Sequence, residues 1–241
     1  MDRNENAPID KYIKALTDIS QAITSDLFLE DLLKLIVMLT ARVMNVDICS
    51  LWLVDESEEP PRIQLKATQA LAPEYVKDRS LAFNEGVVGH VVSTRKPLII
   101  KNVLKSRRFK EKEMARSLGL VSMVGVPLEL KEQKVIGVLN CFTAEAYDFS
   151  KTEVHLLHAV ANQAAVAILN AELVVKTKVI QEELENRKMI QRAKEVLMQR
   201  RNINETEAHR WMQKHSMDSR KSMRQIAEAV LLSEEIDSFH P

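Results

Sequence analysis

The segment 186–232, NRKMIQRAKEVLMQRRNINETEAHRWMQKHSMDSRKSMRQIAEAVLL, contains no Gly or Pro, and its apolar residues recur at helical spacing. Asn204 precedes Glu207 by three residues, and Ser222 precedes Gln225 by three, as in capping boxes that begin a helix. We therefore expect an all-α domain of three short helices at 186–236. Their apolar stripes are Ile190, Ala193 and Leu197, then Ala208, Trp211 and Met212, then Ile226, Ala227 and Val230.

The same segment is basic, whereas the rest of the chain is not. Between residues 186 and 228, eleven Lys and Arg stand against five Asp and Glu, a net charge of +6. Residues 1–175 carry a net charge of −2, so the zero net charge of the 241-residue chain conceals two unlike parts. This asymmetry suggests a polyanion partner. A solvated helix surface gives the same charge pattern, and charge alone does not separate the two interpretations.

Short motifs in this segment resemble the ANTAR domain, a bacterial RNA-binding antitermination module. The resemblance covers about fifty residues. It implies a three-helix bundle that binds paired RNA hairpins with short loops in a nascent leader transcript and stops a terminator from forming. His209 stands where the family often carries Phe or Tyr, although an imidazole can also stack on a base. The motifs are Ala193-Lys194 with Leu197-Met198, Glu207-Ala208, Met217-Asp218, and Ser222-Met223-Arg224 with Ala227-Glu228.

The candidate RNA-binding residues divide by chemistry. Cations are expected to contact phosphates, while His209 and Gln225 can stack or contact base edges, and Trp211 is expected in the core. Two rival functions remain for this part of the chain: a DNA-binding helix-turn-helix, and a basic face that meets an acidic protein. The candidates are Lys194, Arg200, Arg201, His209, Arg210, Lys214, Arg220, Lys221, Ser222, Arg224 and Gln225.

Upstream, helical and strand patterns alternate. Helices are predicted at 10–24, with a narrow apolar seam, and at 29–44, with a broad one that suits packing on a sheet. Two predicted hairpins follow, and the second is apolar on both faces, so both faces must be covered. The predicted strands are Val46–Val54, Arg62–Ala70, Val121–Leu130 and Lys134–Thr143.

The connection between the hairpins resembles the GAF domain, a sensory fold of bacterial signalling proteins. The resemblance covers about residues 11–172 and implies an antiparallel sheet with helices on one face and a small-molecule pocket on the other. It gives the whole chain its expected fold class: an α+β sensor domain joined by a long coiled-coil helix to the all-α three-helix domain. It rests on the run from Phe83 to Val92, on Pro97-Leu98-Ile99-Ile100, and on Gly137-Val138-Leu139.

A ligand for this pocket cannot be named from the sequence. The family's cyclic-nucleotide signature and any bilin-holding Cys-His arrangement are missing, so no cofactor is expected, and an unidentified small molecule is the candidate effector. Aromatic and Met side chains also occur as plain core, and that alternative stays open. The candidate ligand-binding residues are Trp52, Phe83, Phe109, Met114, Met123 and Cys141.

A long helix is predicted at 150–186, beginning at the capping box Ser150-Lys151-Thr152-Glu153. Its apolar stripe has coiled-coil spacing until Val175, after which Ile180 and Leu184 continue in a shifted register. The shift suits signal transmission, and it equally suits a continuous helix with a local irregularity. We expect a parallel homodimer through Tyr12, Leu16, Ile19 and Ile23 together with Ala161, Ala164, Ile168 and Ala171.

Several classes of protein are disfavoured. Nucleotide-binding, zinc-protease and serine-hydrolase motifs are missing, and the histidines lack partners at metal-ligand spacing, so neither an enzyme nor a metal site is expected. Residues 1–10 are polar, which predicts a disordered start without a signal peptide, and no apolar run suggests a membrane span. Cys49 and Cys141 lie in strand-like runs, where buried free thiols are expected. A cytoplasmic protein is therefore predicted.

Overall fold

The computed structural model describes residues 17, 28–70, 79–131 and 134–238. The chain divides into two compact units, Met1–Glu172 and Leu173–Pro241. The expectations for residues 1–10 and for the helix at 10–24 lie outside the described residues, Thr17 apart. The described elements are α2 (Leu29–Met44), β1 (Ile48–Asp55), β2 (Arg62–Thr68), β3 (Ser80–Ala82), α3 (Gly86–Thr94), β4 (Leu98–Ile100), α4 (Lys112–Ser117), β5 (Ser122–Glu129), β6 (Val135–Thr143), α5 (Lys151–Arg201), α6 (Glu205–Ser219) and α7 (Met223–Ser238).

The N-terminal unit contains one antiparallel sheet of six strands in the order β3-β2-β1-β6-β5-β4. The two predicted hairpins are β1–β2 and β5–β6, and their ends differ from the predicted ones by no more than two residues. They meet through the pairing of β1 with β6, in which Cys49 lies opposite Cys141. The run that follows Pro97 forms β4, which pairs with β5 at the edge of the sheet.

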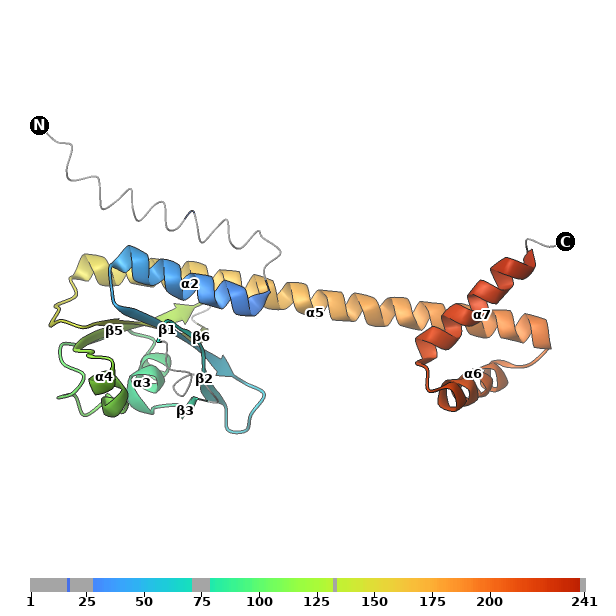
Figure 1. The fold of residues 1–241 in the computed structure, drawn as a ribbon, viewed down its shortest axis with the longest axis horizontal. Coiled ribbons are helices and arrows are strands. Elements are labelled where there is room, and N and C mark those ends of the chain that lie inside the picture. The colour runs from blue at the N-terminus through green and yellow to red at the C-terminus, as the bar shows by residue number, and fades with distance from the viewer. Residues whose placement is uncertain (1–16, 18–27, 71–78, 132–133, 239–241) are drawn as a thin grey trace, which may run out of the picture. The chain divides into compact units, whose positions relative to one another are not determined.

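Each face of the sheet carries its own apolar core, as the double-sided apolar pattern requires. Helices α2 and α5 cover one face, and α3 and α4 lie on the other (Figure 1). In β1 the alternation is direct: Leu51 and Leu53 pack toward α2 and α5, while Trp52 between them packs in the second core. This arrangement confirms the predicted sheet and its helical covering.

Two glycines shape the start of α3. Gly86 has a φ of +65°, a left-handed conformation that strains other residues. At Gly89, a Cβ atom would stand 2.7 Å from the carbonyl oxygen of Ala82 and 2.8 Å from the backbone nitrogen of Asn84. The loop that follows β3 therefore packs directly on the α3 backbone, which brings the helix onto the second face of the sheet.

Helix α5 is a single helix of 51 residues, so the first of the three short helices expected in the basic segment is its last part. Its start is the predicted capping box: the backbone N–H of Ser150 donates to Glu153 Oε2 at 2.8 Å, and the N–H of Glu153 donates to Ser150 Oγ at 3.2 Å. The helix is continuous through the register shift after Val175. This continuity agrees with the interpretation of the shift as a local irregularity in one helix. Without Gly or Pro, nothing in the sequence breaks it.

The first half of α5 is committed to the core of the N-terminal unit. Ala161 and Ala164 are fully buried and Ile168 is 1% exposed, all packed in the core that α2 shares. The prediction that these three residues form a dimer seam is therefore wrong, because the sheet already covers them. An 18-residue window of this helix is long and apolar enough to cross a membrane, contrary to the sequence expectation, but 33% of that window is buried within the protein.

The C-terminal unit packs the end of α5 against α6 and α7 around a small core. Its buried residues confirm the three predicted stripes, with Ile190 and Trp211 at their edges. Both predicted capping boxes form: Asn204 with Glu207 at α6, and Ser222 with Gln225 at α7. The core members with the lowest exposure are Ala193, Leu197, Ala208, Met212 and Ala227.

Candidate functional site

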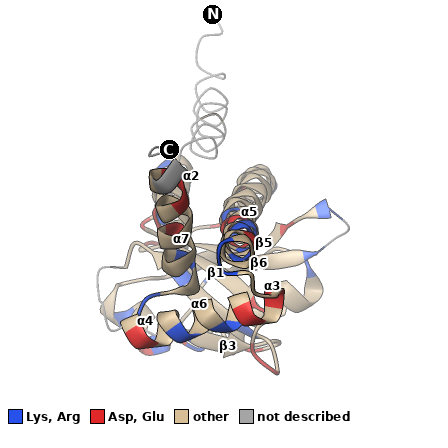
Figure 2. Cartoon of the chain, turned by 90° about the vertical axis from the view of Figure 1, so that its right-hand side faces the viewer, with Lys and Arg blue, Asp and Glu red and all other residues tan. Residues whose placement is uncertain are grey.

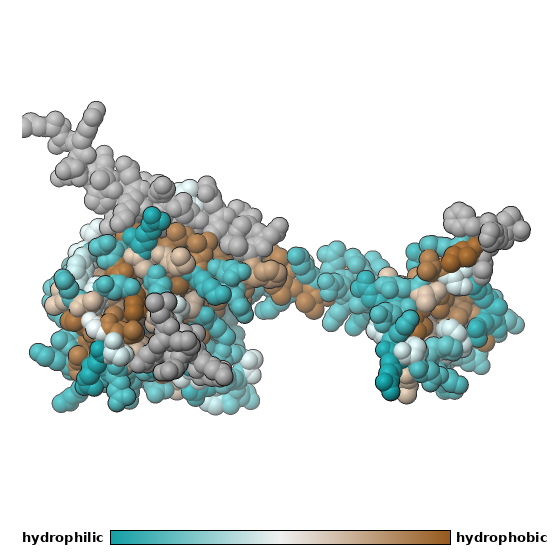
Figure 3. Space-filling view, in the orientation of Figure 1, coloured by the Kyte–Doolittle hydropathy of each residue, from teal (hydrophilic) through white to brown (hydrophobic). Residues whose placement is uncertain are grey.

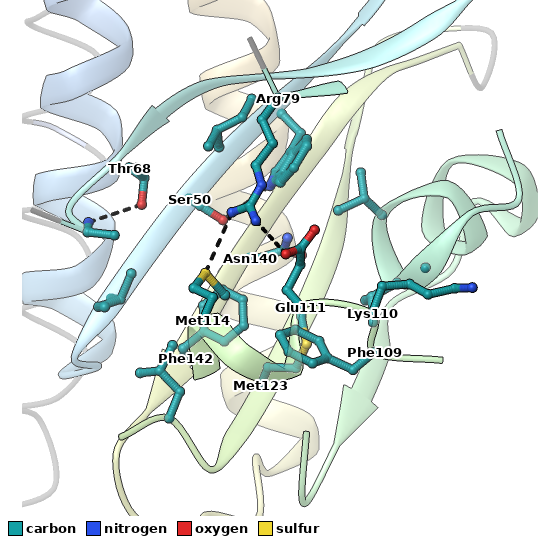
Figure 4. Close-up of a pocket in the computed structure, with 18 of the residues that line it drawn as sticks. Ser50, Thr68, Arg79, Phe109, Lys110, Glu111, Met114, Met123, Asn140 and Phe142 are labelled. Atoms are coloured by element: carbon teal, nitrogen blue, oxygen red, sulfur yellow. Dashed lines mark hydrogen bonds and ion pairs between the residues drawn. The ribbon is translucent and has the colours of Figure 1, made fainter. Parts of the chain in front are cut away.

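A cavity of about 60 Å³ lies in the N-terminal unit between the second face of the sheet and the segments around α3 and α4. This is several times the volume that one water needs. Four of the predicted ligand residues, Trp52, Phe109, Met114 and Met123, line it (Figure 4). The cavity is an apolar pocket of the kind that binds small molecules.

The other two predicted residues lie elsewhere. Phe83 is 39% exposed and is not part of the cavity wall. Cys141 is buried on the opposite face of the sheet, in the core of α2 and α5, so its prediction as a ligand residue is wrong. The cavity is instead lined by its neighbours Asn140 and Phe142, because successive residues of a strand point to opposite faces. Sequence reasoning missed both, although the alternation of β6 around Val138 could have found them.

Polar groups are few in the cavity wall, and most have partners. Trp52 Nε1 donates to Ser50 Oγ at 3.3 Å. Arg79, which precedes β3, forms an ion pair with Glu111 at the start of α4, and its Nη1 lies 3.9 Å from Met114 Sδ (Figure 4). This ion pair joins two segments that are 32 residues apart. The cavity therefore has charged side chains that neutralise each other at one side.

The second candidate site is the surface of the C-terminal unit. His209, Arg210 and Lys214 are exposed on α6, and Arg220 and Lys221 are exposed in the turn that follows it. Arg220 has a φ of 55° and ends the helix in a left-handed conformation. Figure 2 shows both basic and acidic residues on α6, and in the sequence Arg210 and Lys214 lie between acidic residues at the two ends of the helix. The four cations form no ion pair with a described residue, and their charge is available to a polyanion.

The remaining RNA-binding candidates already have partners within the unit. Lys194 Nζ lies 2.6 Å from Glu205 Oε1, and its side chain is only 14% exposed. Arg224 Nε lies 2.9 Å from Glu228 Oε1, and Arg200 Nη1 donates to Ser233 Oγ at 3.1 Å. These three cations therefore have partners within the unit, and their contact with phosphates stays a prediction.

Two more RNA-binding candidates, Gln225 and Ser222, are also engaged. Gln225 Oε1 accepts from the backbone N–H of Ser222 at 3.0 Å, and Ser222 Oγ accepts from the N–H of Gln225 at 3.2 Å. Each side chain thus completes a capping box at α7. The side chain of His209 is exposed and belongs to no capping box. Its contact with a base stays a prediction.

Arg201 and Trp211 form a contact that the sequence did not indicate. The Arg201 guanidinium carbon lies 4.6 Å from the centre of the Trp211 ring, which is half-buried at the edge of the core. His215 stacks on the same ring, with centroids 3.7 Å apart. Arg201 is therefore held by a cation–π contact that fixes the end of α5 against α6.

Exposed apolar residues follow one face of α5 after it leaves the N-terminal unit. Leu173, Ile180 and Leu184 are 50%, 65% and 51% exposed, and Thr177 is exposed between the first two. These four positions are spaced four, three and four residues apart, as in a coiled-coil seam. Figure 3 shows hydrophobic side chains gathered on this part of the helix. Unlike Ile168, these side chains are not buried by the sheet.

Among the described residues there is no group of three or more His, Cys, Asp or Glu side chains that could hold a metal ion. His158 Nε2 lies 3.8 Å from Glu129 Oε2, a contact between the first half of α5 and the end of β5. The described residues of both units thus offer a cavity and a basic surface.

Comparison with known proteins assigns a family model to each of the two units. The model of the GAF domain matches residues 28–168, more than half of the chain. The chain belongs to the GAF domain family. The model of the ANTAR domain matches residues 178–231, which hold the last part of α5, all of α6 and about the first half of α7.

Solved structures agree with the GAF assignment. The GAF domain of an Acinetobacter phosphoenolpyruvate-protein phosphotransferase is 32% identical, with a TM-score of 0.58, and the match covers 68% of this chain and 97% of that one. The GAF domain of the corresponding Coxiella burnetii protein is 25% identical with a TM-score of 0.60, covering 69% and 98%. The six-stranded sheet and its two cores are thus a GAF fold.

A curated relative matches a short part of the chain. The transcriptional regulatory protein PdtaR of Mycobacterium tuberculosis is 40% identical over 52 residues, which are 22% of this chain and 25% of PdtaR. The match spans about a quarter of the relative's length.

Proposed function

We propose that this protein is a signal-responsive RNA-binding transcription antiterminator. Its ANTAR domain would bind paired hairpins in a nascent leader transcript and prevent a terminator from forming. The observation that carries the proposal is the coincidence of the ANTAR match at 178–231 with a packed three-helix core that carries four surface cations without an ion-pair partner among the described residues, Arg210, Lys214, Arg220 and Lys221. The name of PdtaR, a transcriptional regulatory protein, supports it.

The phosphate contacts belong to the cations that the fold leaves without ion pairs. Arg210 and Lys214 lie one helical turn apart on α6 and so face the same direction. Arg220 and Lys221 follow at the end of this helix. Together with His209, they form a surface that has charge for phosphates and one flat ring for a base. Lys194, Arg200 and Arg224 form contacts within the domain, and we assign them no primary role in binding phosphates.

The GAF domain supplies the signal. An apolar cavity inside a folded domain costs packing contacts, so its retention supports occupancy by a small molecule. Helix α5 begins in the GAF domain and ends in the ANTAR core, and it is therefore the element through which occupancy would affect RNA binding. We propose no catalytic role and no cofactor for either domain.

A parallel homodimer is part of the proposal, with its seam redefined. Leu173, Thr177, Ile180 and Leu184 replace Ala161, Ala164 and Ile168, since the latter are covered by the GAF core. Two such helices would bury their exposed apolar side chains against each other. Two ANTAR domains in one dimer suit paired hairpins. The cytoplasm, where transcripts are made in bacteria, is the proposed location.

The test is a salt series of binding by the full-length protein to three nucleic acids: an RNA with two short-loop hairpins, the same RNA with scrambled loops, and duplex DNA. Preference for the first RNA at every salt concentration is expected. Equal affinity for duplex DNA would replace the proposal with a DNA-binding regulator. Absence of binding to all three would favour an acidic protein partner.

A further inference from the structure

Among the described residues that line the cavity, only Asn140 has a buried side-chain oxygen or nitrogen without a hydrogen-bond partner. It is 2% exposed, it lines the cavity, and its Oδ1 has no hydrogen-bond partner in the structure. On β6 it lies between Ser50 of β1 and Gly125 of β5. A buried carboxamide without partners destabilises a fold, so its presence in an otherwise apolar wall requires a compensating group.

The neighbouring glycine makes room for this carboxamide. A Cβ atom on Gly125 would stand 2.6 Å from Asn140 Oδ1, closer than any side chain can approach. Val87 and Val91 of α3 lie next, at 3.5 and 3.6 Å from the same point. Gly125 and these valines offer no hydrogen bond to the amide, and the Ser50 hydroxyl on the other neighbouring strand accepts from Trp52 Nε1 instead.

The charged groups of the cavity wall disfavour a charged occupant. Arg79 and Glu111 pair with each other, and their side chains are 23% and 31% exposed. Lys110 also belongs to the lining, but its side chain extends away from the other residues of the wall (Figure 4). An ion entering the cavity would have to break this pair or stay uncompensated among apolar groups, and both are costly. A neutral molecule disturbs neither partner.

The aromatic wall favours a flat occupant. Trp52, Phe109 and Phe142 all line the cavity, and the rings of Phe109 and Phe142 meet edge to face with centroids 6.1 Å apart. Flat rings pack on such a wall with offset or edge contacts. The volume of about 60 Å³ limits the occupant to a compact molecule.

We propose that the GAF cavity binds a compact, uncharged ring compound whose polar edge hydrogen-bonds with the carboxamide of Asn140. This rests on the proposed sensor function of the cavity and specifies its ligand class. The complementary edge is an amide or a similar group that offers a donor to Oδ1 and an acceptor to Nδ2. Binding satisfies a group that the empty protein leaves unsatisfied, so the amide selects ligands rather than stabilising the fold.

The experiment titrates the ¹⁵N-labelled full-length protein with three probes of equal ring size: benzamide, toluene and benzoate. Benzamide is expected to bind about 10-fold tighter than toluene, the effect of one or two buried hydrogen bonds. Benzoate is expected to bind more weakly than benzamide because of its charge. The side-chain amide resonance of Asn140 should shift with benzamide and not with toluene.

Two variants complete the test. Asn140→Leu should abolish the preference for benzamide over toluene while keeping wild-type thermal stability, since an unsatisfied amide is replaced by an apolar group of similar size. Asn162→Leu is the matched control, because Asn162 Oδ1 is also buried without a partner but lies on α5, outside the cavity. It should keep the preference.

Equal affinity of the wild-type protein for benzamide and toluene would overturn the inference, as would tightest binding of benzoate. Both results are read on the wild type and do not depend on a variant that folds. RNA binding is measured on the same samples. If benzamide is not preferred over toluene and benzoate but hairpin binding is intact, only the proposed ligand class is contradicted. If benzamide is preferred but the protein does not bind hairpins, only the antiterminator function is contradicted.

Discussion

Cys49 and Cys141 lie directly opposite each other on β1 and β6, and both are fully buried as free thiols. Burial raises the pKa of the Cys49 thiol well above its ordinary value, and the adjacent Cys141 raises it further. The reactive thiolate is therefore suppressed at neutral pH. The pair belongs to the core that joins the sheet to α2 and α5.

Alkylation of these thiols should require unfolding of the GAF domain. In the native protein, iodoacetamide labelling is expected to be slow and to accelerate with urea in parallel with the loss of helical circular dichroism. The chain contains only these two cysteines, so no other site contributes. Rapid labelling without urea would show that the β1–β6 core opens locally.

Removing an unpaired cation of the ANTAR surface should weaken RNA binding through electrostatics alone. Arg210→Ala is expected to reduce affinity for cognate and scrambled hairpins alike and to lower the salt slope by about 0.7 to 0.9. Lys194→Met is the matched control, because this side chain is paired with Glu205 and only 14% exposed. Its slope should stay at the wild-type value, and an equal fall in both variants would contradict the assignment.

Gln225 should matter for helix stability before it matters for RNA. Gln225→Ala removes the acceptor for the backbone N–H of Ser222 and is expected to destabilise the ANTAR domain by about 0.5 to 1 kcal/mol. Gln225→Glu keeps that acceptor and should stay close to wild type in urea unfolding. If the Glu variant is as unstable as the Ala variant, the capping box does not explain the contribution of Gln225 to the stability of the domain.

The dimer seam can be tested with two kinds of substitution on α5. Leu173→Glu with Ile180→Glu should give monomers by sedimentation and leave the GAF domain folded, since both side chains are at least half exposed. Ile168→Glu instead buries a charge in the core and should destabilise the GAF domain by about 4 kcal/mol or more. A dimer that survives the double substitution would exclude this seam.

The ion pair between Lys194 and Glu205 gives the ANTAR domain a defined acid sensitivity. A hydrogen bond and charge from Lys194 lower the pKa of Glu205 below its ordinary value of 4.5. A lowered pKa in the folded state means that the stabilisation is present above pH 4.5 and is lost as pH falls through the lowered value. The unfolding temperature of the Glu205→Gln variant should therefore fall less than that of the wild type as the pH is lowered from 6 to 3, as measured by thermal unfolding.

The sequence by itself determined the order and type of the longer elements. Apolar residues on both faces of β5 and β6 required a sheet covered on both faces, and the capping residues at Ser150, Asn204 and Ser222 placed three helix starts. These signals are local, because a strand period or a capping hydrogen bond involves residues within a few positions of one another. The motifs of both families are local in the same sense.

Only the tertiary structure decided which side of each element is used. Ile168 and Ile180 both continue apolar stripes of coiled-coil spacing, yet the sheet buries the first and leaves the second exposed. Likewise, Cys141 and Asn140 are adjacent in β6, and only the packing of α2 and α5 on one face assigns the cavity to Asn140. The ion pair of Lys194 with Glu205 on the next helix also depends on packing, whereas that of Arg224 with Glu228 joins residues four apart on α7. Burial, and pairing between different elements, are properties of contacts that no local period specifies.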